Sequence, residues 1–179
     1  MGNLLFNPNG RIARQRFWQG MIVLTVASVV VSAGAWLIHP SIGLLSYALI
    51  FPYICVYGKR LHDAGQSAWW VIAIWISAVI VQVIVLIILM FTVWPAFMSP
   101  EQKEIFREVM ELSEQGDTAE AMKGVEILMT SLEGLMQRSS LFLMVATNAL
   151  FAMIIGFLKT DPRENKHGPI PGTSAADTF

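Results

Sequence analysis

Charge and cysteine are both scarce in this sequence. Only 14% of the 179 residues are charged, against about 25% in an average soluble domain. Three stretches, residues 17–58, 64–100 and 139–158, contain no Asp, Glu, Lys or Arg, and the one cysteine, Cys55, can form no internal disulfide. An apolar stretch of about 18 or more uncharged residues is typical of a membrane-spanning segment. The composition therefore excludes a disordered chain and argues strongly against a soluble globular domain.

The same scarcity limits the chemistry that the protein can perform. A formal net charge of -1 provides no basic surplus, so we expect no nucleic-acid partner. The three histidines are scattered along the chain and do not join Cys55 in a metal-ligand spacing. We recognise no nucleophile with its base and no phosphate-cradling glycine loop. We therefore predict no catalytic residue, no metal site and no cofactor, and a protein that is not an enzyme.

The uncharged stretches predict four membrane crossings. About 20 residues span the hydrocarbon layer, so residues 17–58 hold two helices, divided at Pro40 because proline disfavours a continuous helix. The four predicted helices are residues 17–38, 41–58, 68–94 and 139–158. Five tryptophans fall near their ends, where indole prefers the membrane interface: Trp18, Trp36, Trp69, Trp70 and Trp94. The predicted fold class is all-α, an integral membrane four-helix bundle with an extramembrane helical hairpin between helices three and four.

Lysine and arginine residues predict the orientation. The connector 99–138 carries four basic and nine acidic residues, whereas eight basic residues fall on the other side of the crossings: Arg11, Arg14, Arg16, Lys59, Arg60, Lys159, Arg163 and Lys166. Because cytoplasmic loops carry the basic excess, we expect both termini in the cytoplasm. The predicted segments are a cytoplasmic 1–16, helices one to three in 17–98, an acidic extracytoplasmic hairpin in 99–138, helix four in 139–158 and a cytoplasmic tail in 159–179.

The connector 99–138 predicts two helices. Ser99–Gln102 forms a capping-box start, and Asp117–Glu120 forms a second helix start. The first helix places Ile105, Val109 and Leu112 on one face. The second has apolar residues at heptad spacing: Met122, Val125, Met129, Leu132 and Met136. Two interpretations are open: the two faces bury each other, or the methionine-rich face binds a protein partner or a second copy.

Gln82 and Asn148 are strongly polar residues near the middle of two predicted crossings. In one interpretation they form a hydrogen bond that joins helices three and four, worth about 0.6–2 kcal/mol. In the other, the protein is a small transporter or channel subunit with a polar path past these two residues. The crossings contain no Asp, Glu, Lys or Arg, which argues against ion-coupled transport.

Three short segments on the basic side carry motifs. G-R-x-x-R-x-x-F-W begins at Gly10, R-L-H-D-x-G-x-S-x-W-W begins at Arg60, and N-x-x-G-P begins at Asn165. Arg11 and Arg14 are three residues apart, so we expect them on one face of a helix. The candidate site residues are Arg11, Arg14, Arg60, His62, Asp63, Gly65, Ser67 and Trp69.

These motifs resemble the bacterial inner-membrane family called domain of unknown function 805. The resemblance runs from about Asn9 to Pro169, with two departures: His167 stands where an aromatic residue is expected, and the connector 99–138 is longer than usual. The resemblance implies a small four-helix protein of the bacterial inner membrane. It carries no catalytic residue over, since the family has no established activity.

Three interpretations of the basic-side motifs are open. In the first, Asp63 pairs with arginines and fixes the first helix against the second and third. In the second, a basic pocket binds an anionic lipid headgroup, because arginine grips phosphate with two parallel N–H bonds; its residues are Arg11, Arg14, Lys59 and Arg60. In the third, His62 is an acid–base group oriented by Asp63. We expect a non-enzymatic structural or binding component whose partners include membrane lipids.

Overall fold

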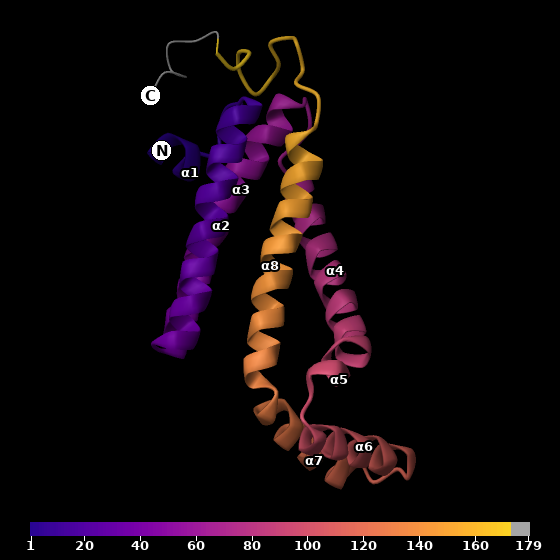
Figure 1. Cartoon of the computed structure of the whole chain (residues 1–179). Coiled ribbons are helices and arrows are strands. Elements are labelled where there is room, and N and C mark those ends of the chain that lie inside the picture. Colours follow the sequence, from indigo (N-terminus) through magenta and orange to yellow (C-terminus); the bar gives the residue numbers. More distant parts are fainter. Residues whose placement is uncertain (173–179) are drawn as a thin grey trace. The chain divides into compact units, whose positions relative to one another are not determined.

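The computed structural model describes residues 1–172, and the last seven residues of the predicted tail, 173–179, lie outside the described part. Within residues 1–172 the chain forms eight α-helices, one short 3-10 helix (η1) and no β-strand (Figure 1). These elements are α1 (Gly2–Phe6), α2 (Arg14–Leu37), η1 (Pro40–Leu44), α3 (Leu45–Asp63), α4 (Trp70–Thr92), α5 (Trp94–Phe97), α6 (Pro100–Glu114), α7 (Thr118–Ser131) and α8 (Glu133–Gly156).

Four helical segments are long and apolar enough to cross a membrane. They are Arg14–Leu37, Pro40–Asp63, Trp70–Thr92 and Glu133–Gly156. The predicted all-α membrane fold with four apolar crossings is confirmed. Two helices extend beyond the predicted crossings: α3 continues past Gly58 to Asp63, and α8 begins at Glu133, before Ser139. The earlier start of α8 follows from a helical turn across Leu132, whose carbonyl accepts the N–H of Met136 at 2.9 Å.

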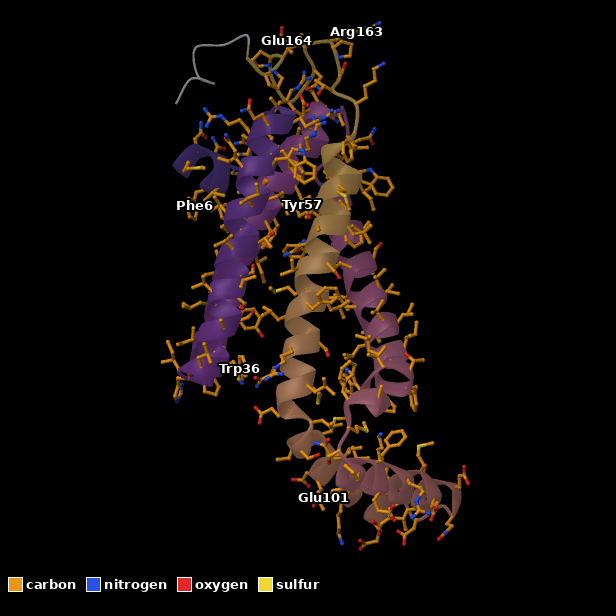
Figure 2. The ribbon with its side chains drawn as sticks, in the orientation of Figure 1. Phe6, Trp36, Tyr57, Glu101, Arg163 and Glu164 are labelled. Atoms are coloured by element: carbon orange, nitrogen blue, oxygen red, sulfur yellow. The ribbon has the colours of Figure 1, made fainter. Side chains whose placement is uncertain are left out.

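The chain divides into two compact units, which are described separately. The first consists of Met1–Ile80 and the segment from Met144 onward. Its core gathers residues from the first half of α2, the second half of α3 and the end of α8: Phe17, Met21, Leu24, Val56, Tyr57, Leu61, Ala152 and Ile155. The side-chain view marks Tyr57 in this core (Figure 2). The core of this unit therefore lies at the end of α3 that carries Asp63, and that is where the candidate residues gather.

The second unit, Val81–Leu143, contains α5, α6 and α7. The capping box at Ser99 and Gln102 is present as predicted, and Asp117 accepts the N–H of Glu120 at the start of α7. Trp94 is 2% exposed, and its indole N–H donates to Ser139 Oγ at 3.1 Å. Both the apolar ring and the polar N–H of this tryptophan are therefore satisfied within the unit, and its place at the membrane interface stays a prediction.

The predicted apolar face of α7 was partly wrong. Leu132 is buried as expected, but Met122 is 68% exposed, and the other buried positions on this helix are Ala121 and Leu128. The face of α7 that contacts α6 differs from the predicted one because the two helices approach at Gly124. A Cβ atom at Gly124 would lie 2.6 Å from Val109. The exposed methionine leaves the alternative of a partner-binding face as a prediction.

Gly156 offers a test of the packing in the first unit. A Cβ atom at Gly156 would lie 2.8 Å from the Trp18 ring and 3.1 Å from the Phe17 ring. We expect Gly156→Ala to lower the free energy of unfolding by about 1–3 kcal/mol, because the buried Phe17 ring and the half-buried Trp18 ring packed against it cannot move aside without strain. Reversible unfolding in detergent micelles measures this change.

The control substitution is Gly134→Ala in the same helix, where nothing lies within 4 Å of the added carbon. It should be neutral or slightly stabilising, since alanine favours a helix over glycine. Equal stabilities of the two variants would contradict the close packing at Gly156.

Candidate functional site

A buried carboxylate at the C-terminal end of α3 is the centre of the candidate site. Asp63 Oδ1 accepts hydrogen bonds from Arg11 Nη2 at 3.1 Å and from Arg11 Nε at 3.3 Å. Asp63 Oδ2 accepts from Arg60 Nη1 and, at 2.8 Å, from Thr160 Oγ1. The side chains of Arg11, Arg60 and Asp63 are at most 1% exposed. We call Asp63, Arg11, Arg60 and Thr160 the Asp63 cluster. Its two arginines carry more positive charge than its one carboxylate can neutralise.

Backbone carbonyls satisfy the second arginine of this cluster. Arg60 Nη2 donates to the carbonyl of Gly156 at 3.1 Å and to that of Leu158. These carbonyls lie at the C-terminal end of α8, where unpaired backbone oxygens carry partial negative charge. Arg60 Nη1 also lies 3.2 Å from Thr160 Oγ1. Arg60 therefore joins the end of α3 to the end of α8.

Arg11 makes the corresponding connection from the N-terminal segment. Its Nη2 donates to the carbonyl of Asp161 at 2.6 Å, and its Nη1 donates to the carbonyl of Arg163 at 2.7 Å. The backbone N–H of Asp161 in turn donates to the carbonyl of Asp63 at 2.8 Å. Figure 2 marks Arg163 in the segment that follows α8. Three parts of the chain that are distant in sequence thus meet at one carboxylate.

Gly65 provides the turn that ends α3 directly after Asp63. Its φ of +73° is in the left-handed region that favours glycine. The N–H of Gly65 donates to the carbonyl of His62 at 3.0 Å, and the N–H of Gln66 donates to that of Leu61 at 2.8 Å. This pair of bonds is the Schellman arrangement that satisfies the last carbonyls of a helix. Gly65 in the middle motif therefore has a structural role.

His62 makes its contacts away from Asp63. Its Nδ1 lies 3.1 Å from the carbonyl of Gly10, and its ring stacks on that of His167 with centroids 3.7 Å apart and planes 7° apart. Asn165 Nδ2 donates to the His62 carbonyl at 3.1 Å. The carboxylate of Asp63 is taken up by the arginines and Thr160, so this geometry does not form the His62–Asp63 acid–base pair. The stack instead joins the middle motif to the last one.

Arg14 is separate from the Asp63 cluster. We expected Arg11 and Arg14 on one helix face, but α2 begins at Arg14, and Arg11 lies in the extended segment before it. The prediction was wrong because the chain turns at Gly10, whose φ is +93°, and remains extended up to the helix cap at Ala13. Arg14 is exposed, and its guanidinium carbon lies 5.8 Å above the Phe157 ring.

Ser67 and Trp69 also lie outside the cluster. Ser67 Oγ accepts the backbone N–H of Trp69 at 3.3 Å, just before α4 begins. Trp69 itself is 78% exposed. Ser67 therefore shapes the turn into α4, and Trp69 is available to the membrane interface.

Of the two polar residues in the crossings, Asn148 lies in the first unit. Its Nδ2 donates to the Tyr53 hydroxyl oxygen at 2.9 Å. Gln82 lies in the second unit, so the hydrogen bond predicted between Gln82 and Asn148 stays a prediction. The sequence analysis did not single out Tyr53, because a tyrosine in an apolar helix is most often core.

The short helix α1 and its contact with Lys59 were not predicted from the sequence. Lys59 is 4% exposed, and its Nζ donates to the carbonyls of Asn3 and Leu4, each at 2.7 Å. A cavity of about 360 Å³ opens beside them. Its lining includes three cations and three asparagines, namely Arg11, Arg16, Lys59, Asn3, Asn7 and Asn9, and no Asp or Glu among residues 1–172. We call this space the Lys59 cavity.

One family model matches the chain. The family described as "Protein of unknown function (DUF805)" matches residues 5–96, just over half of the chain. This is the family that the motifs indicated, and the match contains the first two of them; the third, at Asn165, lies outside it. No curated protein and no solved structure matches the chain.

From the stacked histidines we predict that the protein becomes less stable in acid. Burial, together with nearby His62, Lys166 and Arg11, lowers the pKa of His167 below its ordinary value of 6.5. Between pH 6.5 and the lowered pKa, His167 binds a proton in the unfolded chain but not in the folded chain. The free energy of unfolding therefore decreases as the pH falls through 6.5 toward the lowered pKa. Unfolding in detergent micelles at a series of pH values between 7.5 and 5 measures this loss.

The matched variant is His167→Phe, which keeps a ring for the stack and removes the titration. We expect its stability to vary less with pH over this interval than that of the natural chain. Identical pH dependence of the two proteins would contradict a neutral His167 in the folded state.

Proposed function

Since the chain belongs to the family of unknown function DUF805, we propose its function from the geometry of the site. The protein is a non-enzymatic component of the bacterial inner membrane with both termini in the cytoplasm. It binds the headgroups of anionic lipids at the Lys59 cavity, while the Asp63 cluster holds the surrounding segments in place.

The observation that carries this proposal is the chemistry of the Lys59 cavity. An ammonium group has three N–H donors, and Lys59 uses two of them on the carbonyls of Asn3 and Leu4. The third donor is available to a phosphate oxygen. The lining among residues 1–172 contains no Asp or Glu, so none of these residues repels an anionic headgroup.

The arginines of the Asp63 cluster have a different role in this proposal. The donors of Arg11 and Arg60 are directed at Asp63 and at backbone carbonyls, as described above. Arg11, which lines the cavity, therefore contributes positive potential and rigidity to its wall rather than a direct contact with phosphate, and Arg60 is not part of the described lining. This assignment replaces a headgroup pocket made of the arginines themselves with one centred on Lys59.

A pair of lysine variants tests headgroup binding. Lys59→Met removes the ammonium group and keeps an apolar side chain, and Lys159→Met makes the same change at an exposed lysine outside the described cavity lining. Native mass spectrometry of the purified protein, titrated with phosphatidylglycerol or phosphatidylcholine, counts the bound lipids. We expect a preference for phosphatidylglycerol that Lys59→Met reduces severalfold and Lys159→Met leaves nearly unchanged.

A second variant protects the test if Lys59→Met fails to fold without its contacts to α1. Asn9→Asp places a negative charge on the exposed rim of the cavity, and it should also reduce phosphatidylglycerol binding, most strongly at low salt. Equal binding of the two lipids by the natural chain would overturn the proposal. So would equal losses in the Lys59 and Lys159 variants.

A small transporter or channel subunit is the second candidate, and one observation favours it. Asn148 lines a further cavity, of about 240 Å³, among the apolar helices. Its described lining contains no Asp, Glu, Lys, Arg or His, and Gln82 is not part of it. These features suit a neutral molecule better than an ion.

A further inference from the structure

The cavity beside Asn148 is a separate site within the apolar helices. About 240 Å³ in volume, it is lined by residues of α2, α3, α4 and α8 that all belong to the first unit. An engineered cavity of about 150 Å³ in another protein holds one benzene molecule, so this space accommodates a substituted ring. We call it the Tyr53 cavity.

One wall of the Tyr53 cavity carries a short chain of hydrogen bonds. Asn148 Nδ2 donates to the Tyr53 oxygen at 2.9 Å, and that oxygen lies 3.2 Å from Ser28 Oγ. No residue among 1–172 donates a hydrogen bond to the amide oxygen of Asn148. Asn148 is half-buried among apolar helices, and an acceptor that faces hydrocarbon lacks the water that would otherwise satisfy it. The wall therefore presents an acceptor that calls for an O–H or N–H donor.

The other walls are aromatic and aliphatic. Tyr53 stacks on Tyr57 with ring centroids 6.3 Å apart and planes 18° apart. Trp75 and Phe151 add two more aromatic side chains to the lining. Flat aromatic faces favour a flat ring, through offset-stacked or edge-to-face contacts.

We propose that the Tyr53 cavity binds a neutral, membrane-soluble molecule with a planar ring that carries hydroxyl groups, the chemistry of a quinol. One ring hydroxyl donates to the amide oxygen of Asn148, and the ring lies among Tyr57, Trp75 and Phe151. The apolar tail of such a molecule remains in the lipid. This site is independent of the Lys59 cavity, because the two linings share no described residue.

Binding of a soluble quinol tests this proposal directly. The full-length protein in detergent micelles is titrated with decylubiquinol and, separately, with its oxidised form decylubiquinone, by isothermal titration calorimetry. We expect saturable binding in which the quinol binds about threefold to tenfold more tightly, because only the quinol has a hydroxyl to donate to Asn148. Asn148→Leu should lower quinol affinity to the level of the quinone and leave quinone affinity little changed.

A control variant separates the cavity from general effects of losing a polar group. Thr92→Val removes a hydroxyl in the second unit that donates to its own helix at Ile88, and it should leave both affinities unchanged. If Asn148→Leu fails to fold, Ala78→Ile narrows the described cavity without removing a polar group, and it should weaken quinol binding by at least tenfold.

Three results would overturn the proposal. The first is heat that never saturates and matches titration into empty micelles. The second is displacement of bound decylubiquinol by decanol at the same concentrations as by decylubiquinol itself, which would show that the cavity accepts alkyl chains rather than rings. The third is an unchanged preference for quinol over quinone in Asn148→Leu. None of these results bears on phosphatidylglycerol binding at Lys59, so the two proposals fail separately.

Discussion

The pairing of one buried carboxylate with two buried arginines is the interaction on which the first unit depends. Asp63 receives Arg11 from the N-terminal segment and Arg60 from its own helix. An isolated buried charge is costly, so each of these groups requires the other two and the carbonyls around them. The positive charge that exceeds the carboxylate is met by carbonyls at the end of α8 and beyond it. Removing Asp63 therefore leaves two buried cations without an anionic partner, and removing either arginine leaves Asp63 and backbone carbonyls without their donors.

This constraint also decides which groups are left for function. Arg11 and Arg60 are committed to holding segments together, so they are unavailable as direct ligands, and Arg14 is exposed and lines neither described cavity. The groups that remain are Lys59, which has a donor to spare beside a cavity without acidic residues, and Asn148, whose amide oxygen has no donor among residues 1–172. One candidate site is therefore lined by the N-terminal segment and the other by the apolar helices.

The sequence predicted the features that depend on local chemistry. Charge-free stretches indicated the four crossings, and Ser99 and Gln102 indicated a capped helix. These signals are carried by neighbouring residues, so no knowledge of tertiary structure is needed. The family was predicted in the same way, from motifs that extend over only a few residues.

The features that depend on distant contacts were not predictable. Nothing near His62 in sequence indicates that its ring stacks on His167, and nothing near Lys59 indicates that it reaches the carbonyls of α1. The separation of Arg11 from Arg14 was missed because helical spacing was assumed across a segment that remains extended. Each of these missed features depends on tertiary contacts, which are determined by packing between segments far apart in sequence.

The central claim is that Asp63 and Arg11 stabilise the fold through one another. A double-mutant cycle measures this, with Asp63→Asn, Arg11→Met and the double variant unfolded reversibly in detergent micelles. The account predicts that the two changes are strongly non-additive, with a coupling free energy of about 1–3 kcal/mol. Additive effects, within about 0.5 kcal/mol, would contradict the claim that this carboxylate holds the N-terminal segment in place.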